Sequence, residues 1–123
     1  MAKKRNITIL TDAILITCIV QKGLGDEIVS AAIDAGAQGA TTFYAQGSGV
    51  RERLGLMGVA VEAEKEIVNI VVSDEQSNQV FDAIYLKGQL DTPGKGFMYT
   101  TVLDKAATYI PQEVIEKLGL NDE

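Results

Sequence analysis

The feature that most constrains the fold is an order of segments that occurs twice: a strand, a helix and a second strand. In the first half, the apolar, β-branched run Ile14–Val20 is typical of a buried strand, and apolar residues at helical spacing follow it up to Gly36. Ala40–Ala45, rich in threonine and aromatic residues, is the next predicted strand. In the second half, Glu66–Val72 and Phe97–Leu103 are the predicted strands on either side of a helix.

Local signals mark where the two helices begin and end. Asp26 is the predicted N-cap of the first helix, and Gly36 is predicted to close it because glycine accepts a left-handed backbone conformation. Ser73 and Gln76 have the spacing of a capping box at the start of the second helix, which we expect to end at Gly88.

Two such halves predict an α+β fold of the ferredoxin-like type, β-α-β-β-α-β, with an antiparallel sheet and both helices on one face. The chain of 123 residues has room for one domain. We therefore expect a single domain over residues 1–123, with its core at about 13–104 and a C-terminal tail at 105–123. Pro111 suits the first turn of a short helix from Gln112 to about Leu118. Whether Ile7–Leu10 forms an additional strand is left open.

The composition excludes several kinds of site. The chain has no histidine, so the commonest general base and metal ligand are missing and no Ser/His/Asp or Cys/His set exists. Its formal net charge of -6 disfavours a nucleic-acid-binding surface. Cys18, the single cysteine, lies within a predicted buried strand, which favours an inert thiol over a reactive one. We therefore expect a protein that is not an enzyme.

The N-terminal residues indicate where in the cell the protein is expected. Met1–Arg5 and the apolar stretch after it superficially resemble a signal peptide, but Asp12 interrupts the stretch and no small-x-small cleavage site follows Val20. No run approaches the roughly 18 apolar residues of a membrane span. We expect a cytoplasmic protein without membrane insertion.

Three stretches contain residue types that bind anions. Gln46–Val50 is either a tight glycine turn or a backbone cradle for a phosphate. Thr92–Gly96 is a turn that places Lys95 between two glycines, although its spacing is not that of a P-loop. Glu62–Glu66 is either a solvated strand entrance or a place from which Lys65 reaches a ligand phosphate, and Arg51 and Arg53 add charge nearby.

These stretches also carry a resemblance to a known family. The chain resembles PII-like signalling proteins, relatives of the nitrogen regulatory PII proteins, from about Leu15 to Leu103. The matching segments are Gly36-Ala-Gln-Gly-Ala-Thr-Thr42, Gly47-Ser-Gly49, Glu64-Lys-Glu-Ile-Val-Asn-Ile-Val-Val72 and Pro93-Gly-Lys-Gly-Phe97. Their order and spacing, rather than any one segment, make the resemblance specific.

The resemblance implies a homotrimer with ligand clefts between neighbouring subunits. The segment after the second strand would be the family's T-loop, which responds to ligand and docks onto a target, a membrane transporter or an enzyme. The implied ligand is an adenine nucleotide (ADP, AMP or ATP), and no metal is implied with it. The residues that would bind it are Thr41, Gly47, Ser48, Gly49, Val50, Lys65, Gly94, Lys95 and Gly96.

The chain also departs from the classical members of that family. Its T-loop is shorter and has no tyrosine, which excludes tyrosine uridylylation there. Ala106, Ala107 and Thr108 stand where classical members have phosphate-binding arginines, and Pro93-Gly-Lys-Gly96 replaces their B-loop. ADP, AMP or bicarbonate therefore fits at least as well as ATP with 2-oxoglutarate and magnesium.

The resulting interpretation is a PII-like regulatory protein that senses a small ligand between subunits and regulates a partner through its T-loop. The alternative is a CutA-like metal-binding trimer of the same fold, against which the missing histidine and the predicted burial of Cys18 count. A domain that binds a partner and no small molecule is a third interpretation.

Overall fold

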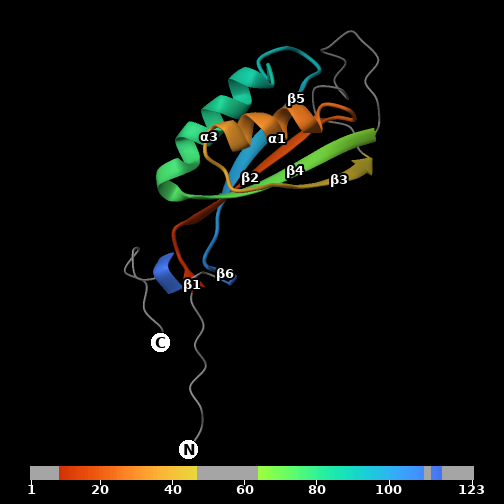
Figure 1. The fold of residues 1–123 in the computed structure, drawn as a ribbon. Coiled ribbons are helices and arrows are strands. Elements are labelled where there is room, and N and C mark those ends of the chain that lie inside the picture. Colours follow the sequence, from red (N-terminus) through yellow and green to blue (C-terminus); the bar gives the residue numbers. More distant parts are fainter. Residues whose placement is uncertain (1–8, 47–63, 110–111, 115–123) are drawn as a thin grey trace, which may run out of the picture.

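The computed structural model describes residues 9–46, 64–109 and 112–114 (Figure 1). Within them, strands and helices alternate much as the sequence predicts. In chain order they are β1 (Ile9–Leu10), β2 (Ala13–Gln21), α1 (Gly25–Asp34), β3 (Thr41–Gln46), β4 (Glu64–Ser73), α3 (Asp74–Lys87), β5 (Gly96–Val102) and β6 (Ala106–Ala107).

The main sheet has four strands in the order β3-β4-β2-β5, and every neighbouring pair is antiparallel. Helices α1 and α3 lie side by side on the same face of this sheet (Figure 1). This is the predicted ferredoxin-like arrangement. A second, two-stranded sheet pairs β1 with β6 beyond one end of the main sheet.

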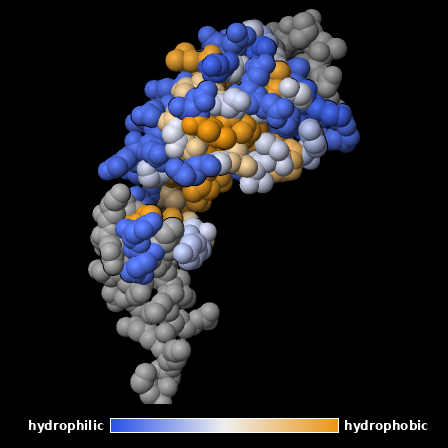
Figure 2. All heavy atoms as spheres, in the orientation of Figure 1, coloured by the Kyte–Doolittle hydropathy of each residue, from blue (hydrophilic) through white to orange (hydrophobic). Residues whose placement is uncertain are grey.

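The core lies between the helices and the sheet face that they cover. Alternate residues of β2 and β4 point into it, and the best-buried of these are Ile16, Cys18, Val68 and Ile70. The helices contribute Ile28, Ala32, Val80 and Ile84. In the space-filling view, hydrophobic residues gather in a band across the middle and hydrophilic residues cover most of the remainder (Figure 2).

The opposite face of the sheet is covered by neither α1 nor α3, and we call it the open face. The strand register arranges its residues in rows across the strands. One row is Phe43, Ile67, Ile19 and Phe97, and the next is Thr41, Asn69, Thr17 and Tyr99. Phe43 is 45% exposed and Phe97 is 63% exposed, so a substantial apolar surface lies on this face.

Most predicted helix boundaries are confirmed. Ser73 and Gln76 form the capping box of α3, and Gly88 is its C-cap. Gly36 follows the C-cap of α1 and has a φ of 117°, the left-handed conformation expected there. The prediction that Asp26 caps α1 is wrong, because the N-cap is Leu24, no side chain of that position bonds the helix, and Asp26 lies within the first turn.

The two ends of the chain agree with the sequence as far as they are described. Ile9–Leu10 forms β1, so part of the open question about Ile7–Leu10 is answered in favour of a strand. Residues 112–114 are helical, and the remainder of the predicted tail helix lies outside the described residues. No helix in the described residues is both long and apolar enough to cross a bilayer.

Cys18 is fully buried in the core, as predicted. Burial raises the pKa of its thiol from 9.0 to about 12, because the charged thiolate is disfavoured away from water. The thiol therefore stays protonated and acts as a small apolar side chain.

Candidate functional site

The residues predicted to bind a ligand fall into three places along the described chain. Gly47, Ser48, Gly49 and Val50 lie outside the described residues, as do the two nearby arginines. The remaining members are Thr41 on β3, Lys65 on β4, and the turn Gly94–Gly96 that leads into β5.

Lys65 lies near the start of β4, opposite Gln21 and Ala45 on the neighbouring strands. The alternation of β4 directs its side chain to the open face, because Glu66 and Val68 are buried on the helix side. Only 9% of Lys65 and 6% of Glu66 is exposed. The interpretation of this stretch as a simple solvated strand entrance therefore does not hold for these two residues.

Thr41 starts β3 and pairs with Asn69, so it shares the open face with Lys65. Asn69 is four positions after Lys65 on β4, which is about 13 Å along a strand. Thr41 is thus on the correct face but not beside the lysine.

The turn before β5 depends on its two glycines. Gly94 has a φ of 85°, which side chains rarely tolerate. A Cβ atom on Gly96 would lie 2.6 Å from Cγ1 of Val20 and 2.8 Å from the carbonyl oxygen of Ile19. Lys95, between them, is partly buried, and its amide donates a hydrogen bond of 3.2 Å to the Thr92 carbonyl.

Thr41 and the turn Gly94–Gly96 lie at opposite edges of the sheet. β3 and β5 are the two outer strands of the sheet, separated by β4 and β2. Three strand spacings place the two edges about 14 Å apart. Lys65, on β4, is closer to the turn than Thr41 is. It pairs with Gln21, next to the Val20–Gly96 pair, so two strand spacings, about 10 Å, separate Lys65 from Gly96. We call Lys65 and the turn Gly94–Gly96 the two half-sites.

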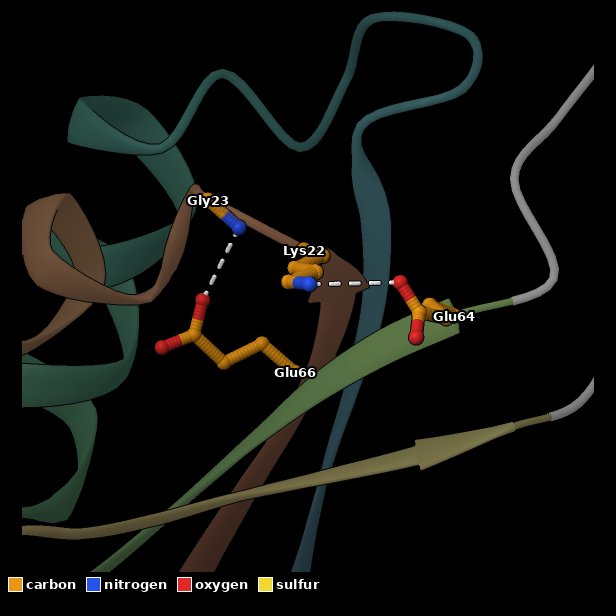
Figure 3. A network of polar contacts seen from close by, with 4 residues as sticks. All are labelled: Lys22, Gly23, Glu64 and Glu66. Carbon is orange, nitrogen blue, oxygen red and sulfur yellow. Dashed lines mark hydrogen bonds and ion pairs between the residues drawn. The ribbon is translucent and has the colours of Figure 1, made fainter.

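A polar network joins the start of β4 to the turn between β2 and α1 (Figure 3). Glu66 Oε1 accepts hydrogen bonds from the amides of Gly23, at 3.1 Å, and Gly25, at 3.0 Å. Lys22 Nζ lies 3.3 Å from Oε1 of Glu64 and 5.7 Å from the ring centroid of Tyr44. The carboxylate of Glu66 thus serves the N-terminus of α1, where the helix dipole favours negative charge.

Sequence reasoning did not find this role of Glu66. Its partners lie 41 and 43 positions away, and the only local signal is the Gly23-Leu-Gly25 turn. A Cβ atom on Gly25 would collide with the carboxylate of Glu66, which explains the glycine there.

Neither of two surface hollows of the described residues is lined by Thr41, Lys65 or Gly94–Gly96. One, of about 290 Å³, lies between α1 and α3, and its lining includes Ala31, Ala83 and Leu86. The other, of about 260 Å³, lies near the start of β2, and its lining includes Asp12, Asp74 and Val102.

The described residues contain no group of three or more histidine, cysteine, aspartate or glutamate side chains that could hold a metal ion. Cys18 is enclosed in the core, so it is not available as a surface ligand. Nothing in this part of the chain favours the CutA-like alternative.

Comparison with known proteins agrees with the fold described above. The model of the family described as "Nitrogen regulatory protein P-II" matches residues 13–113. No curated protein is similar enough in sequence to give a match. Among solved structures, Arabidopsis thaliana PII bound to citrate superimposes with a TM-score of 0.58 at 19% sequence identity, over 76% of this chain and 79% of that one. At that identity the likeness supports the shared fold.

Proposed function

Because the chain belongs to the nitrogen regulatory protein P-II family, we propose that it is a PII-like sensor that works as a homotrimer. The ligand is a small anion, either an adenine nucleotide (ADP, AMP or ATP) or bicarbonate, and it binds in clefts between subunits. The proposal extends to a cytoplasmic regulator that acts on a partner, a membrane transporter or an enzyme, through the segment Val50–Ala63.

The observation that carries this proposal is the separation of the two half-sites. β2 lies between Lys65 on β4 and the Gly94–Gly96 turn before β5, so the two half-sites are about 10 Å apart across the sheet. In the proposed trimer, each cleft combines Lys65 of one subunit with the Gly94–Gly96 turn of its neighbour. Such a head-to-tail interface closes into a ring when it is repeated by rotation.

The open face supports assembly. It carries exposed aromatic side chains, Phe43, Phe97 and Tyr99, in the middle of a sheet whose other face is already packed. Exposed apolar surface of this kind is typical of a protein–protein interface. Packing of three open faces against one another would bring sheet edges of different subunits together.

The chemistry of the half-sites suits an anion. Lys65 and Lys95 each supply an ammonium group, and Lys95 lies between two glycines. This chain has Ala106 and Ala107 where classical members of the family have arginines, so it lacks these partners for further phosphate oxygens. We therefore expect ADP or AMP to bind at least as tightly as ATP.

Ligand binding would act on a partner by population shift. The segment that ends at Ala63 is directly followed by Glu64 and Lys65, so a ligand held by Lys65 favours those conformations of the segment that are compatible with it. The target would bind one of these conformations.

Calorimetry with ADP, AMP, ATP and bicarbonate tests the binding claim. Lys65→Ala and Lys95→Ala should each weaken nucleotide binding by about 10-fold or more, since a charge-assisted hydrogen bond contributes about 1.5–3 kcal/mol. Lys87→Ala, which removes the same charge from the exposed end of α3, is the matched control and should leave affinity unchanged. Absence of binding by any of the four ligands to the folded protein would refute the proposal.

Mixed trimers test whether the cleft lies between subunits. Lys65→Ala and Lys95→Ala chains, unfolded and refolded together, should regain about one quarter of the wild-type sites, because random assembly across a head-to-tail interface pairs intact lysines at that frequency. A site confined to one chain would regain none, since every chain lacks one lysine.

A further inference from the structure

The acidic residue that follows Lys65 has no place in the ligand chemistry proposed above, yet it is among the most enclosed charged groups of the described residues. Glu66 is 6% exposed and points to the helix side of the sheet, opposite to Lys65. Its Oε1 accepts a hydrogen bond from the Gly23 amide (Figure 3). The same oxygen also accepts one from the Gly25 amide. A buried carboxylate with two amide donors is costly to displace, because it would lose both bonds at once.

The partners of Glu66 belong to a rigid part of the molecule. Gly25 is the first residue of α1, whose Ile28 and Ala32 are buried in the core. The bonds therefore tie the first residues of β4 to α1, beyond the antiparallel pairing with β2 and β3. Glu64, two positions earlier on the same side, is held by an exposed ion pair with Lys22, which contributes little.

We propose that Glu66 is a positioning residue for the ligand cleft: its carboxylate holds the start of β4 against the α1 turn and thereby fixes Lys65 on the open face. Side chains alternate between the two faces of a strand. When Glu66 is anchored on the helix side, the position of Lys65 on the open face is therefore fixed as well. Glu66 acts through Lys65 and does not touch the ligand. The ligand-binding part of this inference rests on the function proposed above.

The first measurement needs no ligand. Wild-type protein and variants are treated with an amine-acylating reagent, and the rate at Lys65 is read by peptide mass spectrometry. Glu66→Ala should raise that rate by about threefold or more, because the start of β4 then opens locally. Glu66→Gln keeps an acceptor oxygen and should stay near wild type, and Glu64→Ala is the matched control for charge. An unchanged rate in Glu66→Ala would overturn the proposal.

The second measurement compares ADP with adenosine, which lacks phosphate. Glu66→Ala should weaken ADP binding by about fivefold or more and leave adenosine binding unchanged, because its effect passes through the lysine. In the Lys65→Ala background, Glu66→Ala should have no further effect on ADP. Equal losses for both ligands, or additive losses in the double variant, would indicate a merely structural role.

The two measurements separate the two proposals. If wild-type protein binds neither ADP nor adenosine, the adenine-nucleotide function fails, and the acylation rate alone decides the role of Glu66. If Glu66→Ala does not fold, Gly25→Ala provides a second route, because its Cβ atom would displace the carboxylate from the other side. The acylation rate at Lys65 should then rise in Gly25→Ala and stay at the wild-type value in Gly39→Ala, where a Cβ atom meets open space.

Discussion

Thr17 Oγ1 donates a hydrogen bond of 2.9 Å to Oδ1 of Asn69, across the two central strands of the open face. The two residues are directly opposite each other in the register of β2 and β4. Thr17 is only 5% exposed even though no helix covers this face. The pair satisfies two polar groups in the middle of a surface that is otherwise largely apolar.

Replacement of Thr17 by valine should lower the free energy of unfolding by about 1–2 kcal/mol, because the Asn69 oxygen keeps its desolvated position and loses its donor. Urea denaturation measures this. Thr101→Val, an exposed position on the same face at the β5 edge, is the matched control and should change stability little. Equal losses for both variants would mean that the hydrogen bond contributes nothing specific.

Phe97→Asp should dissociate the proposed trimer into monomers, because it places a charge in the apolar surface that would become buried. Light scattering coupled to size-exclusion chromatography gives the mass directly. Leu86→Asp makes the same kind of change on the helix side of the molecule, where the leucine is 71% exposed, and should leave the mass unchanged. A Phe97→Asp protein that retains the wild-type mass would exclude the open face as the interface.

Cys18 should make the protein less stable as the pH rises above about 9. Below pH 9.0 the thiol is protonated in both states, but between that value and about 12 the unfolded thiol loses its proton while the folded one keeps it. The unfolded state is then favoured, by up to about 4 kcal/mol at the upper end.

Other groups also titrate in that range, so the measured quantity is the difference between wild type and Cys18→Ala as a function of pH. Cys18→Ala should have a lower free energy of unfolding than wild type below pH 9, because the smaller side chain packs less well. From pH 9 upward, the stability of the variant should fall less steeply than that of wild type. Parallel curves for the two proteins would contradict the prediction.

Gly88→Ala should destabilise the packing of α3 on α1. A Cβ atom at this position would lie 2.7 Å from Cδ1 of Ile28 and 2.9 Å from the carbonyl oxygen of Ile84, so either the core or the helix end must shift. We expect a loss of about 1–3 kcal/mol in thermal or urea denaturation. Gly39→Ala, where a Cβ atom meets nothing within 4 Å, should be close to neutral.

The sequence predicted those parts of the fold whose causes are local. The capping box joins Ser73 to Gln76, only three residues away. The run Ile14–Val20 is predicted to be a buried strand because its residues are mostly apolar and β-branched. Strand bounds differ from the prediction by one or two residues, since pairing rather than composition decides where a strand stops. β4, for example, extends one residue beyond the predicted Val72 to Ser73, which pairs with Ala13.

Features that depend on distant partners were missed or misassigned. Asp26 has the chemistry of an N-cap, but Glu66 of another strand provides the carboxylate that binds the start of α1. Nothing in the neighbourhood of Glu66 in the sequence reveals this, since a charged strand entrance is usually solvated. Thr41 and Gly96 lie at opposite edges because of the order of the strands within the sheet. The order of the elements along the sequence does not determine that arrangement.

The central position of β2 also governs when this protein can fold during synthesis. β2 is the first strand of the main sheet to be made, yet both of its neighbours come later: β4 pairs with it from Ala13 to Gln21, and β5 from Ile14 to Val20. Its apolar side chains therefore stay without one flanking strand until Val102 has left the ribosome. Until then the sheet lacks its β5 strand and exposes apolar side chains of β2, and an incomplete sheet of this kind is prone to aggregation.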